Sequence, residues 1–242
     1  MRERTGLEGY WQGKLELNPA IDVESPALIE QQFYVPAPWN IQIRHLRRDP
    51  EAVELSGVVK PLQNQNFRDI QRRFSEGTIT LVRKISIPAE RMEAVTKGRI
   101  KAFLVFEGSN YKTEVIINDK KAGVHEGGHL PFEFDVSSLI SAGENEVSVT
   151  VDNIRRQHAV PQEQFNWMNY GGPYRPVYIE WRPSTFIQQA SVFPGRDADG
   201  WYLDVAVQLS NSADAQVEMN LTSGTENVSQ SLAVKKGRSP SA

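Results

Sequence analysis

Apolar and polar residues alternate in short runs along most of this chain, with turn-forming residues between the runs. A period of two puts apolar side chains on one face of an extended strand, whereas a helix would repeat them every three or four residues. The runs predict strands over residues 10–17, 78–87, 99–106, 112–117, 130–134, 146–151 and 177–181. Glycine and asparagine, which adopt positive φ angles at low cost, stand in the connections. The sequence therefore predicts an all-β fold.

Two stretches depart from the alternation. Residues 19–66 hold many prolines, too many for central strands, so we expect a loop there with a few short edges. Residues 136–140 follow Asp135, whose carboxylate can accept the unpaired backbone N–H groups of a helix start. A single short helical turn is expected at that point and nowhere else.

Charge and composition exclude several classes of partner. The chain has 27 Lys and Arg against 30 Asp and Glu, a net charge of -3, so nothing drives it toward nucleic acid. It has no cysteine, which excludes disulfides and thiolate metal sites. No apolar run approaches the length of a membrane span, and Met1 is followed by charged residues. The chain as written is expected in the cytoplasm, or in the periplasm or secreted if a signal peptide was removed.

The stretch HEGGH at 125–129 matches a zinc-binding pattern. That chemistry needs a helix, which places the two histidines one turn apart. Gly127 and Gly128 each cost a helix about 1 kcal/mol relative to alanine, and Pro131 follows closely. We expect a turn between strands in which His125 makes loop hydrogen bonds, and no metal site.

Four phrases resemble family 2 glycoside hydrolases, which include β-glucuronidases and β-galactosidases. The phrases are VPAPWN at 35–40, GTITLVRKISIP at 77–88, HEGGHLPFEFD at 125–135 and NWMNYGGPYRPVYIE at 166–180, and they follow the family's order. The chain departs from the family pattern at Thr80 and Leu81, where Trp and Tyr are usual, and at His129, where Tyr is usual. The resemblance implies a galactose-binding-like jelly-roll β-sandwich over residues 1–183.

A second β region is expected after Pro183. Residues 187–193, 201–209, 216–222 and 229–234 predict four more strands. The family places an immunoglobulin-like sandwich here, a fold that needs about seven strands and roughly 100 residues. Residues 184–242 are too few for it, so an incomplete immunoglobulin-like sandwich is expected, in a truncated chain.

The segment before the last motif offers candidate sugar contacts. It is long, polar and rich in aromatic residues, and an aromatic ring can cover the C–H face of a sugar while amides bond its hydroxyls. The resemblance implies that Asn166 reaches the bound sugar, although the family usually has Asp there. Asn166 and Trp167 are our candidate substrate-binding residues. The alternative is that Trp167 is structural, together with Asn169 and Tyr170, which would support the turn, and Arg175, which would pair with a carboxylate.

The resemblance implies the N-terminal, non-catalytic portion of a retaining β-glycosidase of the β-glucuronidase or β-galactosidase type. Such enzymes hydrolyse O-glycosyl bonds with two carboxylates about 5–5.5 Å apart, and no pair of acids stands out here. We expect no catalytic residue, no cofactor and no activity from this chain alone. The implied partners are a β-glycoside, a catalytic barrel and further copies in a homo-oligomer. The alternatives are a stand-alone carbohydrate-binding module and a scaffold domain.

Overall fold

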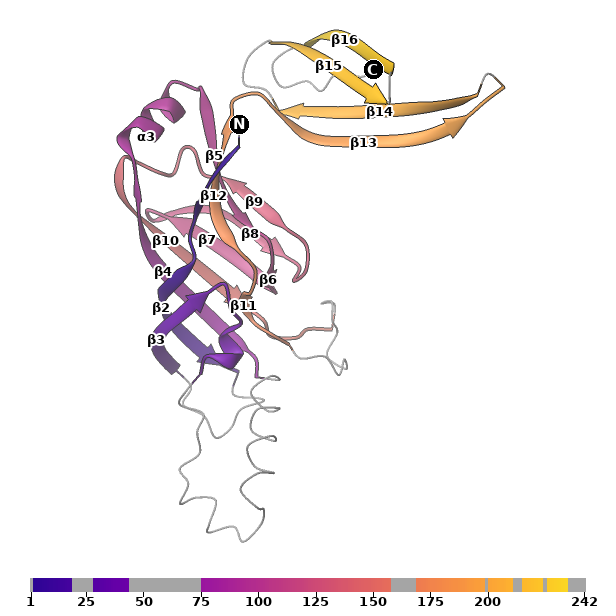
Figure 1. Cartoon of the computed structure of the whole chain (residues 1–242). Coiled ribbons are helices and arrows are strands. Elements are labelled where there is room, and N and C mark those ends of the chain that lie inside the picture. Colours follow the sequence, from indigo (N-terminus) through magenta and orange to yellow (C-terminus); the bar gives the residue numbers. More distant parts are fainter. Residues whose placement is uncertain are drawn as a thin grey trace, which may run out of the picture. The chain divides into compact units, whose positions relative to one another are not determined.

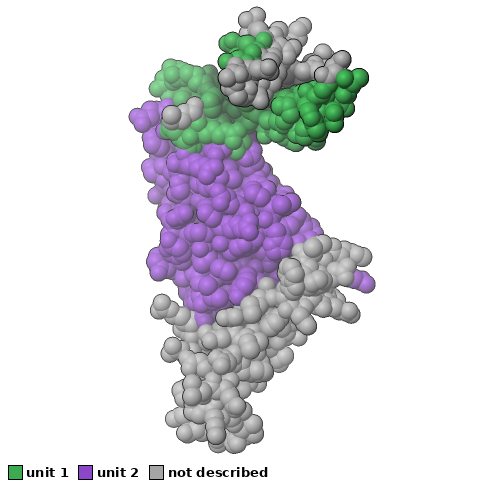
Figure 2. Space-filling model, turned by 45° about the vertical axis from the view of Figure 1, so that its right-hand side comes forward, with its two compact units in different colours: residues 1–3, 93–101, 181–242 green, residues 4–92, 102–180 purple. Residues whose placement is uncertain are grey.

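The computed structural model describes residues 2–18, 28–43, 75–157, 169–198, 200–210, 215–223 and 226–234. Strands dominate these residues, which confirms the all-β prediction (Figure 1). The chain divides into a larger unit, residues 4–92 and 102–180, and a smaller unit, residues 1–3, 93–101 and 181–242 (Figure 2). The boundary placed at 183 from the sequence stays a prediction.

Two sheets make up the sandwich. The first has the strand order β3-β2-β4-β10-β7-β8 and the second the order β1-β12-β5-β9. The first sheet consists of β3 (Leu28–Val35), β2 (Gly9–Leu17), β4 (Gly77–Ile87), β10 (Gly143–Asp152), β7 (Lys112–Ile117) and β8 (Lys120–Glu126). The second consists of β1 (Glu3–Gly6), β12 (Val177–Pro183), β5 (Ile100–Phe106) and β9 (Phe132–Asp135).

The core lies between these sheets because each strand turns alternate apolar residues inward. Leu15, Leu81 and Val149 of the first sheet are at most 2% exposed, as are Leu104 and Ile179 of the second. Burying one such side chain contributes roughly 1.5–3 kcal/mol. The alternation that predicted the strands is therefore also what holds the two layers together.

Strand β3 lies at a sheet edge, as the expected loop with a few short edges over residues 19–66 allows, but its eight residues make it longer than a short edge. It pairs along its whole length with β2, from Gly9 opposite Val35 to Glu16 opposite Leu28. Proline density over the whole region suggested a loop, but β3 contains no proline and alternates buried with exposed residues. Residues 19–27 and 44–66 lie outside the described residues.

At Tyr34, on the outer edge of β3, a side chain bonds the backbone groups that a neighbouring strand would otherwise bond. The Tyr34 N–H donates to Gln42 Oε1 over 2.6 Å, and Gln42 Nε2 donates to the Tyr34 carbonyl over 3.0 Å. Gln42 follows the short 3-10 helix η1 (Trp39–Ile41). One amide thus satisfies both backbone groups of this edge residue.

The expectation of a single helical turn is wrong. Helix α3 (Ala89–Thr96) follows Pro88 and ends before Gly98, which has a φ of +66°. Proline near the start and glycine after the end are typical helix boundaries. No residue of α3 is buried, and its eight residues include only two large apolar side chains, Met92 and Val95, too few to mark a helix by periodicity. Residues 137–139 form the expected turn, with Asp135 Oδ1 accepting the Ser137 N–H at 3.1 Å.

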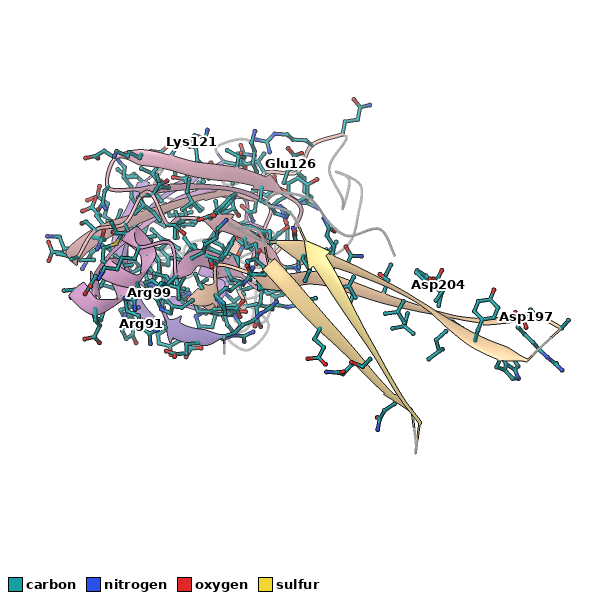
Figure 3. All side chains as sticks on the ribbon, turned by 90° about the horizontal axis from the view of Figure 1, so that it is seen from above. Arg91, Arg99, Lys121, Glu126, Asp197 and Asp204 are labelled. Atoms are coloured by element: carbon teal, nitrogen blue, oxygen red, sulfur yellow. The ribbon has the colours of Figure 1, made fainter. Side chains whose placement is uncertain are left out.

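In the smaller unit, the four predicted strands are present as two antiparallel hairpins. One joins β13 (Phe186–Arg196) to β14 (Trp201–Ser210), and the other joins β15 (Ala215–Ser223) to β16 (Glu226–Val234). Figure 3 shows Asp197 at the turn of the first hairpin and Asp204 along it. The Gly200 N–H closes this turn by donating to Asp197 Oδ1 at 3.1 Å. Among the described residues, no helix is long and apolar enough to cross a membrane.

Candidate functional site

The predicted sugar contacts, Asn166 and Trp167, lie outside the described residues, within the segment 158–168. The structure does describe what precedes and follows this segment. Residues 153–157 lead out of β10, and residues 169–171 lead into the short strand β11 (Gly172–Pro173), which pairs with β6 (Ser109–Asn110). The base of the segment can therefore be examined at atomic detail.

Four buried asparagines surround this base, and we call them the asparagine cluster: Asn40, Asn110, Asn153 and Asn169. Each is at most 5% exposed. They come from four separate places in the sequence: η1, β6, the end of β10 and the residue after the segment. A buried amide is tolerated only when it is hydrogen-bonded, so these side chains report a fixed local geometry.

Two members of the cluster bind each other across the ends of the segment. Asn153 Nδ2 donates to the Asn169 carbonyl over 2.8 Å, and Asn169 Nδ2 donates in return to the Asn153 carbonyl. Asn153 Oδ1 also accepts the Gly77 N–H at 2.9 Å. The chain therefore leaves and re-enters the sandwich at one point.

The other two members fix the residues that follow. Asn110 Nδ2 donates to Asn169 Oδ1 at 2.9 Å and to the Tyr170 carbonyl at 2.7 Å. Asn40 Oδ1 accepts the Gly171 N–H at 2.7 Å. Asn169 is therefore structural, but its amide bonds the Asn153 carbonyl and the Asn110 side chain, whereas Asn110 and Asn40 bond the backbone next to the turn.

One buried ion pair joins the cluster. Glu76, immediately before β4, is 2% exposed, and its Oε1 accepts from Arg155 Nε. Glu76 Oε1 also accepts Asn169 Nδ2 at 3.3 Å, and Oε2 accepts the Arg155 backbone N–H at 3.1 Å. A buried carboxylate needs such partners to offset its desolvation. With three donors on it, the Glu76 carboxylate holds the Arg155 backbone and the Asn169 side chain in place.

Contrary to expectation, Arg175 pairs with no carboxylate among the described residues. Within the described residues, its Nη1 donates to the His129 carbonyl at 3.2 Å, and its guanidinium lies 5.4 Å from the centroid of the Tyr174 ring. The Tyr174 hydroxyl donates to the Gly128 carbonyl over 2.6 Å. The last motif and the HEGGH stretch therefore bind each other through backbone carbonyls.

His125 is not a loop residue, because β8 continues through Glu126 and the turn begins only at Gly127, where φ is +138°. Its ring stacks on Phe132 with centroids 3.9 Å apart and an interplanar angle of 11°. Partial burial lowers the pKa of His125 below its ordinary value, against a smaller opposite effect of the Gly127 backbone. The described residues contain no group of three potential metal ligands.

Parts of this site could be predicted from the sequence. Asn40 and Asn169 lie within the motifs WN and NYGG, and the sequence predicts a backbone-bonding role for Asn169 alone. Glu76, Asn110 and Asn153 stand in no motif that had been singled out for function. A polar residue shortly after an apolar strand, such as Asn153 after VSVTV, is the sequence signal for this cluster.

Comparisons with known proteins agree with this architecture. Residues 6–190 match the family model described as glycosyl hydrolases family 2, sugar binding domain. The β-glucuronidase of Canis lupus familiaris is 26% identical over 243 residues, covering 91% of this chain and 35% of that protein. The β-galactosidase of Thermoanaerobacter pseudethanolicus is 31% identical over 141 residues, covering 57% of this chain and 18% of that protein.

A solved structure shows the same fold. The β-glucuronidase of Bifidobacterium dentium, complexed with coumarin-3-O-glucuronide, aligns with a TM-score of 0.64 at 18% identity, over 97% of this chain and 42% of that one. The chain thus spans about a third of the dog protein and two fifths of the bacterial one. Because the family model covers most of the sequence, the chain belongs to glycosyl hydrolase family 2 and contains that family's N-terminal sugar binding domain.

Proposed function

We propose that this chain serves as the non-catalytic N-terminal part of a retaining β-glycosidase of the β-glucuronidase or β-galactosidase type. A catalytic barrel would supply the two carboxylates that such hydrolysis requires. The match of residues 6–190 to the sugar binding domain carries the proposal. The relatives, named as β-glucuronidases and β-galactosidases, support the choice of substrate class.

Within this function, the segment 158–168 supplies a sugar contact. Asn166 would exchange hydrogen bonds with a hydroxyl, and Trp167 would cover an apolar face of the ring. The buried cluster at the base of the segment supports this role, because a loop that carries a binding residue is most effective on a rigid scaffold.

The test uses the purified chain with phenyl β-D-glucuronide and phenyl β-D-galactoside. We expect no hydrolysis by these 242 residues, because residues 6–190 match the sugar binding domain of the family. We expect backbone amide shifts at residues 158–168 when one glycoside is titrated. Asn166→Ala should abolish these shifts, while Asn220→Ala, an exposed position on β15, should leave them unchanged. Turnover that a carboxylate substitution abolishes would contradict the proposal, as would shifts that persist in Asn166→Ala.

A stand-alone carbohydrate-binding module remains the second candidate. It is favoured by one observation, that the asparagine cluster and Glu76 all lie within the larger unit. If the chain alone binds one of these glycosides with a dissociation constant well below about 1 mM, the result would support the binding module. Such a constant corresponds to a binding free energy stronger than about 4 kcal/mol. Detectable binding in the millimolar range would support a site that a barrel completes.

A further inference from the structure

Two exposed tyrosines lie side by side on the outer face of the six-stranded sheet, where β3 forms the edge and β2 is its neighbour (Figure 1). Tyr10 of β2 stands opposite Tyr34 of β3, and their ring centroids are 5.4 Å apart at an interplanar angle of 77°. Tyr10 is 66% exposed and Tyr34 is 41% exposed, whereas the adjacent Trp11 and Phe33 point into the core. The pair therefore offers solvent two aromatic rings nearly at right angles to each other.

Two exposed glutamines continue this surface along the strands. Gln12 and Gln32 are the next pair on the same face, roughly 7 Å from the tyrosines along each strand. Neither amide bonds another of the described residues, whereas Thr80 and Thr150 elsewhere on this face bond each other at 3.0 Å. These four side chains make up what we call the tyrosine surface: Tyr10, Tyr34, Gln12 and Gln32.

The backbone beneath the tyrosine surface is held in place from two sides. At the edge, the Gln42 amide bonds both backbone groups of Tyr34. On the inner face β2 and β3 pack closely, since a Cβ added at Gly13 would lie 2.2 Å from Phe33 Cδ2. A ligand that binds here does not have to order the backbone first, and binding without that cost is stronger.

The chemistry of these side chains fits a sugar. An aromatic ring covers the C–H face of a pyranose, and an amide exchanges hydrogen bonds with its hydroxyls as both donor and acceptor. The next pair along the strands is Lys14 opposite Glu30, whose charges cancel, so the region does not attract an acidic polymer. A stable protein interface buries about 1,200–2,000 Å² in total, more than these four side chains supply.

We propose that the tyrosine surface binds a neutral, β-linked glycan chain. One sugar ring lies against the two tyrosine rings, and the hydroxyls of its neighbour bond Gln12 and Gln32. An extended glycan can follow the two strands, because the pairs succeed one another in a straight row. This site lies on β2 and β3, outside the segment 158–168, so the inference does not depend on Asn166. It adds to the proposed function a second place at which the domain holds carbohydrate.

The test titrates the purified chain with cellotetraose and xylotetraose, which are neutral and β-linked, and with tetramannuronate, which is β-linked but acidic. Calorimetry gives the dissociation constant, and backbone amide shifts give the place of binding. We expect at least one neutral glycan to bind, with shifts at residues 9–12 and 32–35, and tetramannuronate to bind more weakly or not at all.

Four variants locate the binding energy. Tyr10→Ala should raise the dissociation constant at least about fivefold, as the loss of an aromatic anchor does in other interfaces. Tyr10→Phe keeps the ring and should stay within about twofold of the wild type. Gln12→Ala should weaken binding less than Tyr10→Ala does. The matched control is Tyr202→Ala, which removes a tyrosine of β14 that is 50% exposed and should leave the constant unchanged. Urea midpoints show whether each variant is folded.

The outcomes separate this site from its alternatives. Binding that shifts residues 9–12 and 32–35, weakens in Tyr10→Ala and persists in Tyr10→Phe and Tyr202→Ala supports the inference. If neither neutral glycan binds, or if Tyr10→Ala binds as well as the wild type, the inference is overturned and the tyrosines are a cross-strand pair that stabilises the sheet.

Three other results would also overturn it. Shifts confined to residues 158–168 would assign the glycan to that segment and leave the proposed function standing. Equal or tighter binding of tetramannuronate would contradict the neutral class of ligand. Shifts at residues 9–12 and 32–35 that grow with protein concentration, in the absence of glycan, would make the surface a contact between two copies of the chain.

Discussion

Gly171→Ala should be among the most destabilising small substitutions in the larger unit. A Cβ added at Gly171 would lie 2.1 Å from Trp39 Nε1 and 2.7 Å from Asn153 Cγ. Both neighbours are 1% exposed, so neither side chain can swing into solvent. The conflict must be relieved by moving the chain at the base of the segment 158–168.

The magnitude follows from two contributions. Overpacking a buried site costs about 1–3 kcal/mol. Moving Gly171 also strains two hydrogen bonds of its backbone. Its N–H donates to Asn40 Oδ1 at 2.7 Å, and its carbonyl accepts the Trp39 N–H at 3.0 Å. Losing one buried hydrogen bond costs about 1–3 kcal/mol. We expect a loss of about 3 kcal/mol in the free energy of unfolding, or a fall in Tm of about 6–12 °C.

Urea unfolding followed by tryptophan fluorescence measures the change. Gly6→Ala is the control, because nothing lies within 4 Å of a Cβ there, and it should change stability by less than about 0.5 kcal/mol. Trp39→Phe removes the atom that the new methyl group meets, so the double variant should lose less than the sum of the two single losses. A midpoint for Gly171→Ala equal to that of Gly6→Ala would refute the steric argument.

Three further predictions use other contacts. The pKa of His125 is lower in the folded chain than in the unfolded chain, so the unfolded chain binds the proton more readily. The contribution of His125 to stability should therefore be complete above about pH 6.5 and decrease as the pH falls below that value. Between pH 8 and 5, the Tm of His125→Gln should fall less than that of the wild type. Arg4→Ala should destabilise the fold by about 1 kcal/mol, because Arg4 Nε bonds the buried carboxylate of Glu180 at 3.1 Å; no change in the urea midpoint would argue against this. Gly123→Ala should cost about 1 kcal/mol or more, because a Cβ would lie 2.3 Å from Phe134 Cε1, and adding Phe134→Leu should restore part of the Tm.

The strands were predictable because their signal is local. Alternation over a few residues is enough to place β4 or β10, and the Asn118-Asp119 turn between β7 and β8 takes the positive φ angles, 49° and 61°, that such residues allow. Helix α3 lacks a local signal of this kind. It packs no residue into the core, so its only marks were Pro88 and Gly98 at its ends.

The site was predictable only where a motif carried it. Asn166 and Asn169 stand in the NWMNYGG phrase, and family resemblance drew attention to both. Glu76 is one of 30 acidic residues and is separated from Arg155 by most of the sandwich in sequence. Its role depends on a burial and a contact that form only when β4 and β10 pair, from Thr78 opposite Asp152 onward. Long-range pairing of that kind leaves no trace in local composition.

The amide of Gln42 has a consequence for how this protein behaves in concentrated solution. An exposed strand edge offers unpaired N–H and C=O groups on which another chain can add as a strand, which is a common route to aggregation. At Tyr34 both backbone groups are already bonded by the Gln42 amide. The side chain therefore acts as a one-residue mimic of a neighbouring strand. Replacing it with alanine should leave the fold in place and make the chain more prone to form fibrils.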